Sequence, residues 1–287
     1  KATANGIEIH YEERGDAANP PMLLIMGFGA QLTLWPEELV DALVERGFRV
    51  IRYDNRDVGL SQKFDGVKAP GIVKMTLLSK IGLKPKVPYT LADMADDGAG
   101  LLDALGIDKA HIVGLSMGGF ATLHFGLRHP ERAISLAVTG CGYGADKGNR
   151  EQFLSEAEKV ALQYDNNGSV AVADFYSLSS TRVQFQNKNP RGWAEFKTQL
   201  GQHSATGAAN TMRGYQKTRP SLYDLEGQLT KLYVPTLIVT GDEDEPCLEP
   251  ALYLKRAIPS AGLSILPRSG HTINLEEPDV FNSVLHA

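Results

Sequence analysis

The residues best suited to chemistry form the pentapeptide GLSMG at 114–118, which has the composition of a turn that presents a nucleophilic serine. An apolar run, 110–113, enters this pentapeptide, and a segment of helical character, 119–128, follows it. Ser116 at the apex of such a turn has a strained backbone, and the flanking glycines avoid a collision. The amino end of the following helix also favours negative charge beside the hydroxyl. This context favours a nucleophile over an ordinary turn serine.

A serine hydroxyl becomes an effective nucleophile when a base removes its proton during attack. His271 is the candidate base, because it follows a predicted strand in a glycine-containing loop that could reach Ser116. His203 falls in a long helical stretch and could contact a substrate. The other histidines fit the role of base less well: His10, His111, His124, His129 and His286.

A carboxylate has to orient the histidine. The segment DEDE at 242–245 places four carboxylates directly after a predicted strand. One of them must accept the second ring hydrogen of His271, which fixes the tautomer of the ring and stabilises the imidazolium. These residues alone do not show which carboxylate bonds to the histidine. The remaining carboxylates are explained as part of a solvated acidic loop.

The elements that must position these residues alternate between strand-like and helix-like patterns. Continuous apolar runs predict buried strands, and an alternating pattern predicts a half-exposed one. One helix begins after Thr90, with Asp93 as its capping partner, and ends at Gly106. The predicted strands are 6–13, 21–26, 48–53, 110–113, 134–139, 235–240 and 263–266, and the predicted helices are 35–46, 91–105, 119–128 and 278–286. This order predicts a mainly parallel, doubly wound α/β sheet.

About ninety residues separate the predicted strand 134–139 from the next one, 235–240. This stretch is too long for a loop in a compact domain. We predict that residues 141–230 form a helical cap inserted at the carboxyl edge of the sheet, where such folds bind ligands. Residues 1–140 and 231–287 then form the α/β core. Most aromatic side chains of the insertion are expected to pack its own helices.

Composition and charge exclude several classes of function. The chain has 287 residues, 43% of them hydrophobic and 22% charged, as in ordinary globular proteins. A net charge of −5 gives no reason to expect nucleic acid or an anionic membrane as a partner, and no apolar run has the length of a membrane span. The first residues lack a signal-peptide pattern, so we expect a cytoplasmic protein. Cys141 and Cys247 offer neither a disulfide framework nor metal-ligand spacing.

Four motifs carry a resemblance to a known family. They are MGFG at 26–29, DNRDVGLS at 54–61, the serine turn at 114–118 and Gly-His at 270–271. In this order they resemble the α/β-hydrolase-fold superfamily, specifically its capped serine esterases. The chain is also loosely similar to bacterial polyketide methylesterases, which share the opening Met-Gly and the Asn/His-Arg-Asp turn.

The resemblance implies an α/β-hydrolase fold whose catalytic triad is Ser116, Asp244 and His271. The family spacing Gly-x-x-Asp after the strand selects Asp244, with Asp242 as the second choice. An oxyanion hole needs two converging backbone N–H groups. The resemblance assigns them to Met117 and Phe28, and Phe28 could also line an acyl pocket.

Three features leave questions open. Met26 stands where histidine is commoner, so the hydrogen bonds that usually brace this turn are in doubt. Asp54 and Arg56 invite a catalytic reading, but a charged turn more often ties loops together. The apolar segment 72–83 is either a lid over the pocket entrance or a short buried helix.

We therefore expect a serine hydrolase that cleaves carboxylic esters of small to medium, largely apolar substrates through an acyl-enzyme on Ser116. No metal or cofactor is expected, the partner is a small-molecule ester, and the chain is a monomer or a homodimer. A carbon–carbon bond hydrolase, a lactonase or a perhydrolase could use the same triad. A ligand receptor without catalysis is a further alternative on this fold.

Overall fold

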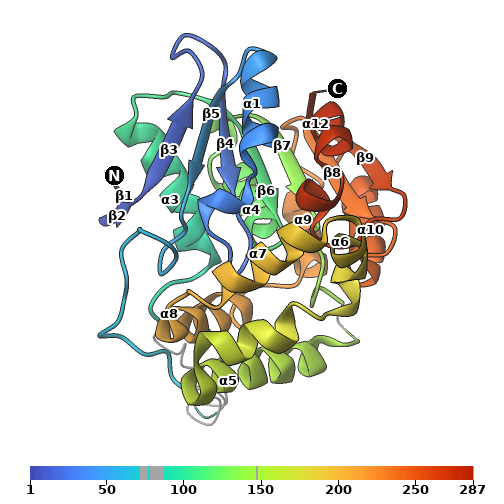
Figure 1. Ribbon diagram of the computed structural model, residues 1–287. Helices are drawn as coiled ribbons and strands as arrows, with labels where there is room; N and C mark the ends of the chain where they lie inside the picture. The colour runs from blue at the N-terminus through green and yellow to red at the C-terminus, as the bar shows by residue number, and fades with distance from the viewer. Residues whose placement is uncertain (72–76, 78–86, 147, 287) are drawn as a thin grey trace.

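A sheet forms the centre of the molecule (Figure 1). The computed structural model describes residues 1–71, 77, 87–146 and 148–286. Its strands are β1 (Ala2–Ala4), β2 (Ile7–Ile9), β3 (Tyr11–Arg14), β4 (Pro21–Ile25), β5 (Arg49–Tyr53), β6 (Ala110–Leu115), β7 (Ala133–Thr139), β8 (Thr236–Gly241) and β9 (Ala261–Leu266). β1 pairs with β2, and the other strands form one sheet in the order β3-β5-β4-β6-β7-β8-β9. β3 is antiparallel to β5, whereas the other neighbours in this sheet are parallel.

The central strands are apolar on both faces because helices cover both faces. In β4, Leu23 and Ile25 belong to one hydrophobic core cluster, and Met22 and Leu24 belong to the other. Successive side chains of a strand point to opposite faces, so a strand between two helical layers needs a continuous apolar run. This confirms the mainly parallel, doubly wound sheet that the sequence predicts.

The helices around the sheet are α1 (Glu37–Glu45), α3 (Leu91–Ala104), α4 (Met117–Arg128), α9 (Glu226–Leu229), α10 (Glu245–Ala257), α11 (Ile273–Glu276) and α12 (Pro278–His286). Side chains of α3, α4 and α10 join the core cluster on one face, and those of α1 and α12 join the cluster on the other. Thr90 and Asp93 form the predicted capping box at the start of α3. There the backbone N–H of Thr90 donates to Asp93 Oδ2 at 2.7 Å.

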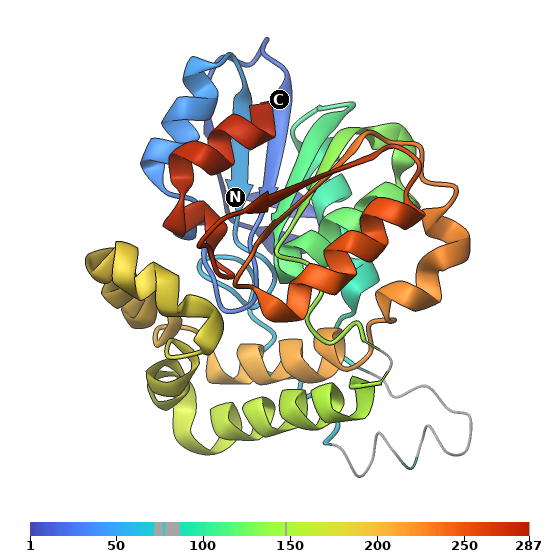
Figure 2. The same ribbon diagram turned by 90° about the vertical axis from the view of Figure 1, so that its right-hand side faces the viewer.

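A second group of helices lies between β7 and α9 in the sequence. It comprises α5 (Arg150–Tyr176), α6 (Val183–Lys188), α7 (Pro190–Leu200), α8 (Ala205–Asn210) and the π-helical η4 (Thr211–Gln216). Short 3-10 turns are η1 (Leu32–Leu34), η2 (Pro130–Arg132), η3 (Ser180–Arg182) and η5 (Leu222–Leu225). Figures 1 and 2 place α5, α7 and α8 beyond one end of the sheet, where they form the helical cap.

For two predicted elements the structure shows why the observed bounds differ. The strand predicted over 6–13 is divided between β2 and β3, because the backbone N–H of His10 donates to Ser61 Oγ at 2.8 Å. β2 then pairs with β1, and β3 pairs with β5. The helix predicted from Trp35 begins at Glu37, after Pro36.

The sequence does not predict α10. This helix follows the acidic run and contains Pro250, a residue that normally interrupts helices. The segment 72–83 lies outside the described residues apart from Leu77, so its assignment as a lid or a core helix stays a prediction. Among the described helices, none has both the length and the apolar character needed to cross a bilayer.

Candidate active site

Ser116 lies on a strained turn between β6 and α4. Its backbone has φ 59° and ψ −115°, a region that residues other than glycine rarely occupy. A Cβ on Gly114 would lie 2.1 Å from the carbonyl oxygen of Gly118. A Cβ on Gly118 would lie 2.0 Å from the carbonyl oxygen of Ile25. The turn therefore requires glycine at both positions, as the sequence predicts.

Ser116, His271 and Asp244 form a continuous chain of hydrogen bonds. His271 Nε2 lies 2.8 Å from Ser116 Oγ, and His271 Nδ1 lies 2.8 Å from Asp244 Oδ2. The three residues follow β6, β8 and β9, parallel strands whose carboxyl ends meet at one edge of the sheet. Asp244 is fully buried, whereas Ser116 and His271 are half-buried. The structure thus brings together the three residues that the sequence singles out.

The surroundings of Asp244 keep its carboxylate ionised. Burial alone would raise the pKa of Asp244, but the adjacent His271 ring and its hydrogen bond outweigh burial and lower this pKa below its usual value. The Cys247 thiol and the Arg182 guanidinium act in the same direction. Asp242 instead lies at the surface, where its carboxylate accepts a hydrogen bond from the backbone N–H of Ser269 at 3.1 Å.

The loop that carries His271 is held by Glu276, a residue whose role no sequence motif predicts. The buried carboxylate of Glu276 accepts hydrogen bonds from the backbone N–H of Gly270 at 2.6 Å and of Thr272 at 3.0 Å. It also accepts one from the Thr272 hydroxyl at 2.9 Å. The cap contacts the same loop, because the N–H of His271 donates to the carbonyl of Thr181 at 2.8 Å. A single acidic residue after a histidine is too weak a signal to reveal this brace.

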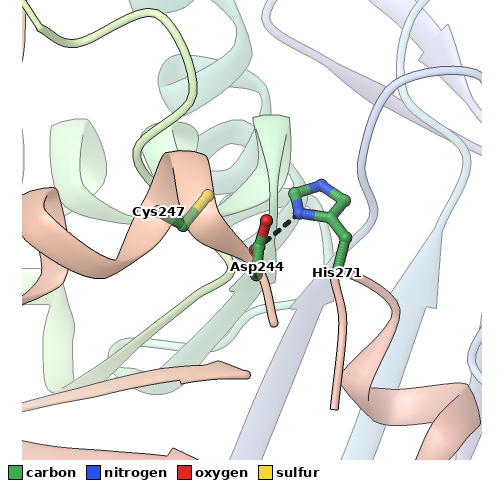
Figure 3. A group of neighbouring side chains, drawn as sticks. All are labelled: Asp244, Cys247 and His271. Atoms are coloured by element: carbon green, nitrogen blue, oxygen red, sulfur yellow. Dashed lines mark hydrogen bonds and ion pairs between the residues drawn. The ribbon is translucent and has the colours of Figure 1, made fainter. Parts of the chain in front are cut away.

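Asp244, Cys247 and His271 also form a compact group of possible metal ligands (Figure 3). One ligand atom from each residue lies within 4.8 Å of the others. The Asp244 carboxylate and His271 Nδ1 already bond to each other, as the dashed line in Figure 3 marks. Burial raises the pKa of the Cys247 thiol well above its usual value, and a protonated thiol is a poor ligand. This chemistry fits an orienting group for His271 better than a metal centre.

The backbone of residues 26–29 approaches the nucleophile. A Cβ on Gly27 would lie 3.1 Å from Ser116 Cβ and 3.7 Å from Ser116 Oγ. Met117 begins α4, so its N–H is among the first-turn amides that have no acceptor within the helix. Phe28 and Met117 both line the cavity that contains Ser116. The backbone of residues 26–29 and the first residue of α4 therefore lie beside Ser116.

The turn after β5 braces this loop despite the presence of Met26. The side-chain amide of Asn55 donates to the carbonyl of Met26 at 2.8 Å. The carboxylate of Asp54 accepts from the N–H of Leu32 at 2.8 Å and from that of Leu60 at 2.8 Å. Because the Asn55 bond is made to a main-chain oxygen, the side chain at position 26 does not determine it.

Other residues that the sequence singles out have structural contacts. Arg56 forms a buried ion pair with Asp97 at 2.5 Å, which supports the structural interpretation of the charged turn. Cys141 is buried, and burial raises the pKa of its thiol. His203 lies in a separate small pocket with Phe28, and burial lowers its pKa to about 4. Within the described part of the chain, the main cavity is not lined by His10, His111, His124, His129, His203 or His286.

A cavity of about 550 Å³ opens beside Ser116, between the cap and the sheet. Its lining is mostly apolar, and α5 contributes more of the lining residues than any other element. The apolar side chains include Phe28, Phe120, Phe153, Val160, Phe175 and Met212. Arg182 and Arg219 line it too, and no motif in the sequence indicates a role for either.

Comparison with known proteins places this site in a family. The family model for the alpha/beta hydrolase fold matches residues 20–278. The enol-lactonase from Burkholderia xenovorans LB400 is similar with a TM-score of 0.80 and 26% identity, over 99% of this chain and 97% of that chain. A thermophilic esterase from Thermogutta terrifontis has a TM-score of 0.79 and 25% identity, over 100% and 96%. Rhodomycin D methylesterase DauP from Streptomyces sp. (strain C5) is 33% identical over 136 residues, 47% of this chain and 40% of the relative. The chain therefore belongs to the α/β hydrolase fold family.

Proposed function

We propose that this chain is a serine hydrolase that cleaves carboxylic esters of small to medium, largely apolar substrates through an acyl-enzyme on Ser116. The observation that carries the proposal is the pair of 2.8 Å hydrogen bonds that link Ser116 Oγ, His271 and Asp244. The mostly apolar cavity beside Ser116 supports the substrate class. The likeness to an esterase and to a methylesterase supports the bond type.

Acylation begins when Ser116 Oγ attacks the ester carbonyl carbon and its proton passes to His271 Nε2. Asp244 accepts a hydrogen bond from the N–H of His271 Nδ1 and stabilises the imidazolium that forms. The bond between the carbonyl carbon and the alcohol oxygen then breaks, and the alcohol leaves with the proton from His271. Deacylation repeats the sequence with water, which releases the acid and restores Ser116.

The negative oxygen of each tetrahedral intermediate needs stabilisation from groups already in place. We assign this role to the backbone N–H groups of Met117 and Phe28. The first belongs to the amino end of α4, where the helix dipole also favours negative charge. The second belongs to the loop that Asn55 and Asp54 hold against the sheet.

In the proposed domain division, one part of the chain carries the catalytic residues and the other selects the substrate. Residues 1–140 and 231–287 would form the catalytic core, and residues 141–230 would form the cap. Cap residues line the cavity, and the cap residue Thr181 accepts a hydrogen bond from the backbone of His271. The cap is therefore expected to determine which esters reach Ser116.

The proposal is tested with p-nitrophenyl esters of increasing acyl length. We expect turnover by the wild-type protein and a loss of about 10⁴-fold or more in kcat for Ser116→Ala. Ser283→Ala is the matched control, because Ser283 is an exposed serine on α12 that bonds to the carbonyl of Asp279. A folded wild-type protein that cleaves none of these esters would favour a ligand receptor.

A lactonase is the second candidate, since the enol-lactonase from Burkholderia xenovorans LB400 has a similar structure over nearly the whole chain. A lactone is a cyclic ester, so the same triad could open it without releasing a separate alcohol. Assaying γ- and δ-lactones beside the open-chain esters distinguishes the two candidates. A higher kcat/KM for the lactones would favour the second.

A further inference from the structure

The buried arginines of the described chain fall into two groups. Those away from the cavity, Arg52, Arg56 and Arg213, each form an ion pair with at least one carboxylate. Those that line the cavity, Arg182 and Arg219, form no ion pair within residues 1–71, 77, 87–146 and 148–286. The remaining positions of the sequence contain no aspartate or glutamate.

The buried guanidinium of Arg219 has an N–H donor group without a hydrogen-bond partner among the described residues. The residue is 2% exposed, and its guanidinium lies over the ring of Phe120 at 3.8 Å and over that of Phe153 at 4.8 Å. Its Nε donates to the side chain of Gln216 at 2.8 Å, and its Nη2 donates to the carbonyl of Tyr143. Its Nη1 has no partner among the described residues. Burial lowers the pKa of Arg219 to about 10, so the side chain remains a cation at neutral pH.

Arg182 shares a small pocket with the proposed reacting groups. It is 7% exposed, and its guanidinium lies over Tyr176 at 4.5 Å and over Phe196 at 5.6 Å. Its Nε has no hydrogen-bond partner among the described residues. It lines the large cavity and also the small pocket beside Ser116 and His271.

Aromatic packing alone does not account for both cations. Stacking on a ring offsets part of the free energy lost when a guanidinium leaves water, but the N–H groups still need acceptors. A carboxylate offers two oxygens that match the planar N–H fork of arginine. Each of the other buried arginines forms an ion pair with such a carboxylate, whereas no described carboxylate forms one with Arg182 or Arg219.

The other charged groups of the cavity leave room for an anion. Asp244 is bound to His271, and Glu156 accepts a hydrogen bond from Gln152 at 2.8 Å and another from Tyr143. Lys159 adds a further positive charge to the lining. Lys159 is exposed, so the buried cations of this lining that form no ion pair with a described carboxylate are the two guanidinium groups.

We propose that Arg182 and Arg219 form a carboxylate-binding subsite, so that the preferred substrates are esters with an apolar chain that ends in a carboxylate. This inference rests on the proposed ester hydrolysis at Ser116 and adds the chemical class of the substrate. The apolar lining holds the chain, and the guanidinium groups hold its charged end. The ester carbonyl then lies at Ser116.

The test compares two esters of the same shape, ethyl hydrogen adipate and its neutral terminal amide. We expect the wild-type protein to favour the acid by at least about tenfold in kcat/KM, because hydrogen bonds between charged groups are stronger than neutral ones. The preference should fall towards one in Arg182→Gln and in Arg219→Gln. The Arg191→Gln variant should keep the preference for the acid. Arg191 is 91% exposed on α7, so this substitution removes the same charge from the surface instead of the cavity. Thermal melting shows which variants are folded.

Equal kcat/KM values for acid and amide in the wild-type protein would overturn the subsite, whether or not the arginine variants fold. A preference that survives in both folded arginine variants would overturn it as well. If the wild-type protein cleaves neither ester, the result contradicts the proposed ester hydrolysis, and the subsite needs its own test. Hexanoate and hexanamide binding to Ser116→Ala, measured by calorimetry, then decides the subsite: tighter binding of hexanoate supports it, and equal binding contradicts it.

Discussion

Replacing Asp244 by asparagine removes the negative charge of the proposed catalytic acid and keeps the side chain at almost the same shape. This substitution therefore tests Asp244 apart from the neighbouring carboxylates. Asp244 Oδ2 lies 2.8 Å from His271 Nδ1 and is buried, so the asparagine amide would occupy the same place. An amide that donates to Nδ1 moves the ring hydrogen to Nε2, and this nitrogen can then no longer accept the proton of Ser116. In serine hydrolases this exchange lowers kcat by about 10⁴. At about 1.36 kcal/mol for each tenfold change, this is about 5.5 kcal/mol of transition-state stabilisation.

Asp242→Asn is the matched control, because it removes a carboxylate two residues away in the same loop. Asp242 is exposed and accepts a hydrogen bond from the backbone of Ser269 at 3.1 Å. A surface change of this kind usually alters free energies by less than about 0.5 kcal/mol, so kcat should stay within about threefold. The assay is the initial rate on p-nitrophenyl butyrate, with circular dichroism to confirm folding. A crippled Asp242→Asn beside an active Asp244→Asn would refute the reasoning and reassign the acid.

Three further results are expected. Gly118→Ala should lower activity and destabilise the protein by about 1–3 kcal/mol in urea unfolding, because the new Cβ would lie 2.0 Å from a backbone oxygen at the end of β4. Gly227→Ala, where nothing lies within 4 Å, should not destabilise it. The pKa of Asp244 is lowered in the folded state, so its ionised form stabilises the fold above the usual value of 3.8, and this contribution is lost as pH falls through the folded value. The difference in melting temperature between wild type and Asp244→Asn should therefore shrink below about pH 4. Because burial raises the thiol pKa of Cys141 and of Cys247, neither should react with iodoacetamide at pH 8 until the protein is unfolded in urea.

Local sequence patterns predict much of the fold and the core of the site. The strain at Ser116 and the need for glycine at 114 and 118 arise within five residues, so the motif contains this information. Apolar runs predict the buried strands, because a strand covered on both faces has no polar side. The choice of Asp244 over Asp242 came from the family spacing, and the hydrogen bond to His271 agrees with it.

The remaining features depend on contacts between distant segments. Glu276 holds the loop of His271, and Asn55 holds the loop of Met26, but neither residue has a local signature. Arg182 and Arg219 differ from the other buried arginines because no described carboxylate forms an ion pair with either, and only the tertiary structure reveals this difference. α10 escapes prediction because local rules weigh against the proline inside it.

The most direct test of the central claim is covalent labelling with a fluorophosphonate, followed by peptide mapping with mass spectrometry. The account predicts a single adduct on Ser116, none in Ser116→Ala, and much slower labelling in His271→Ala. A folded protein that stays unlabelled, or one that carries its adduct on another residue, would contradict it.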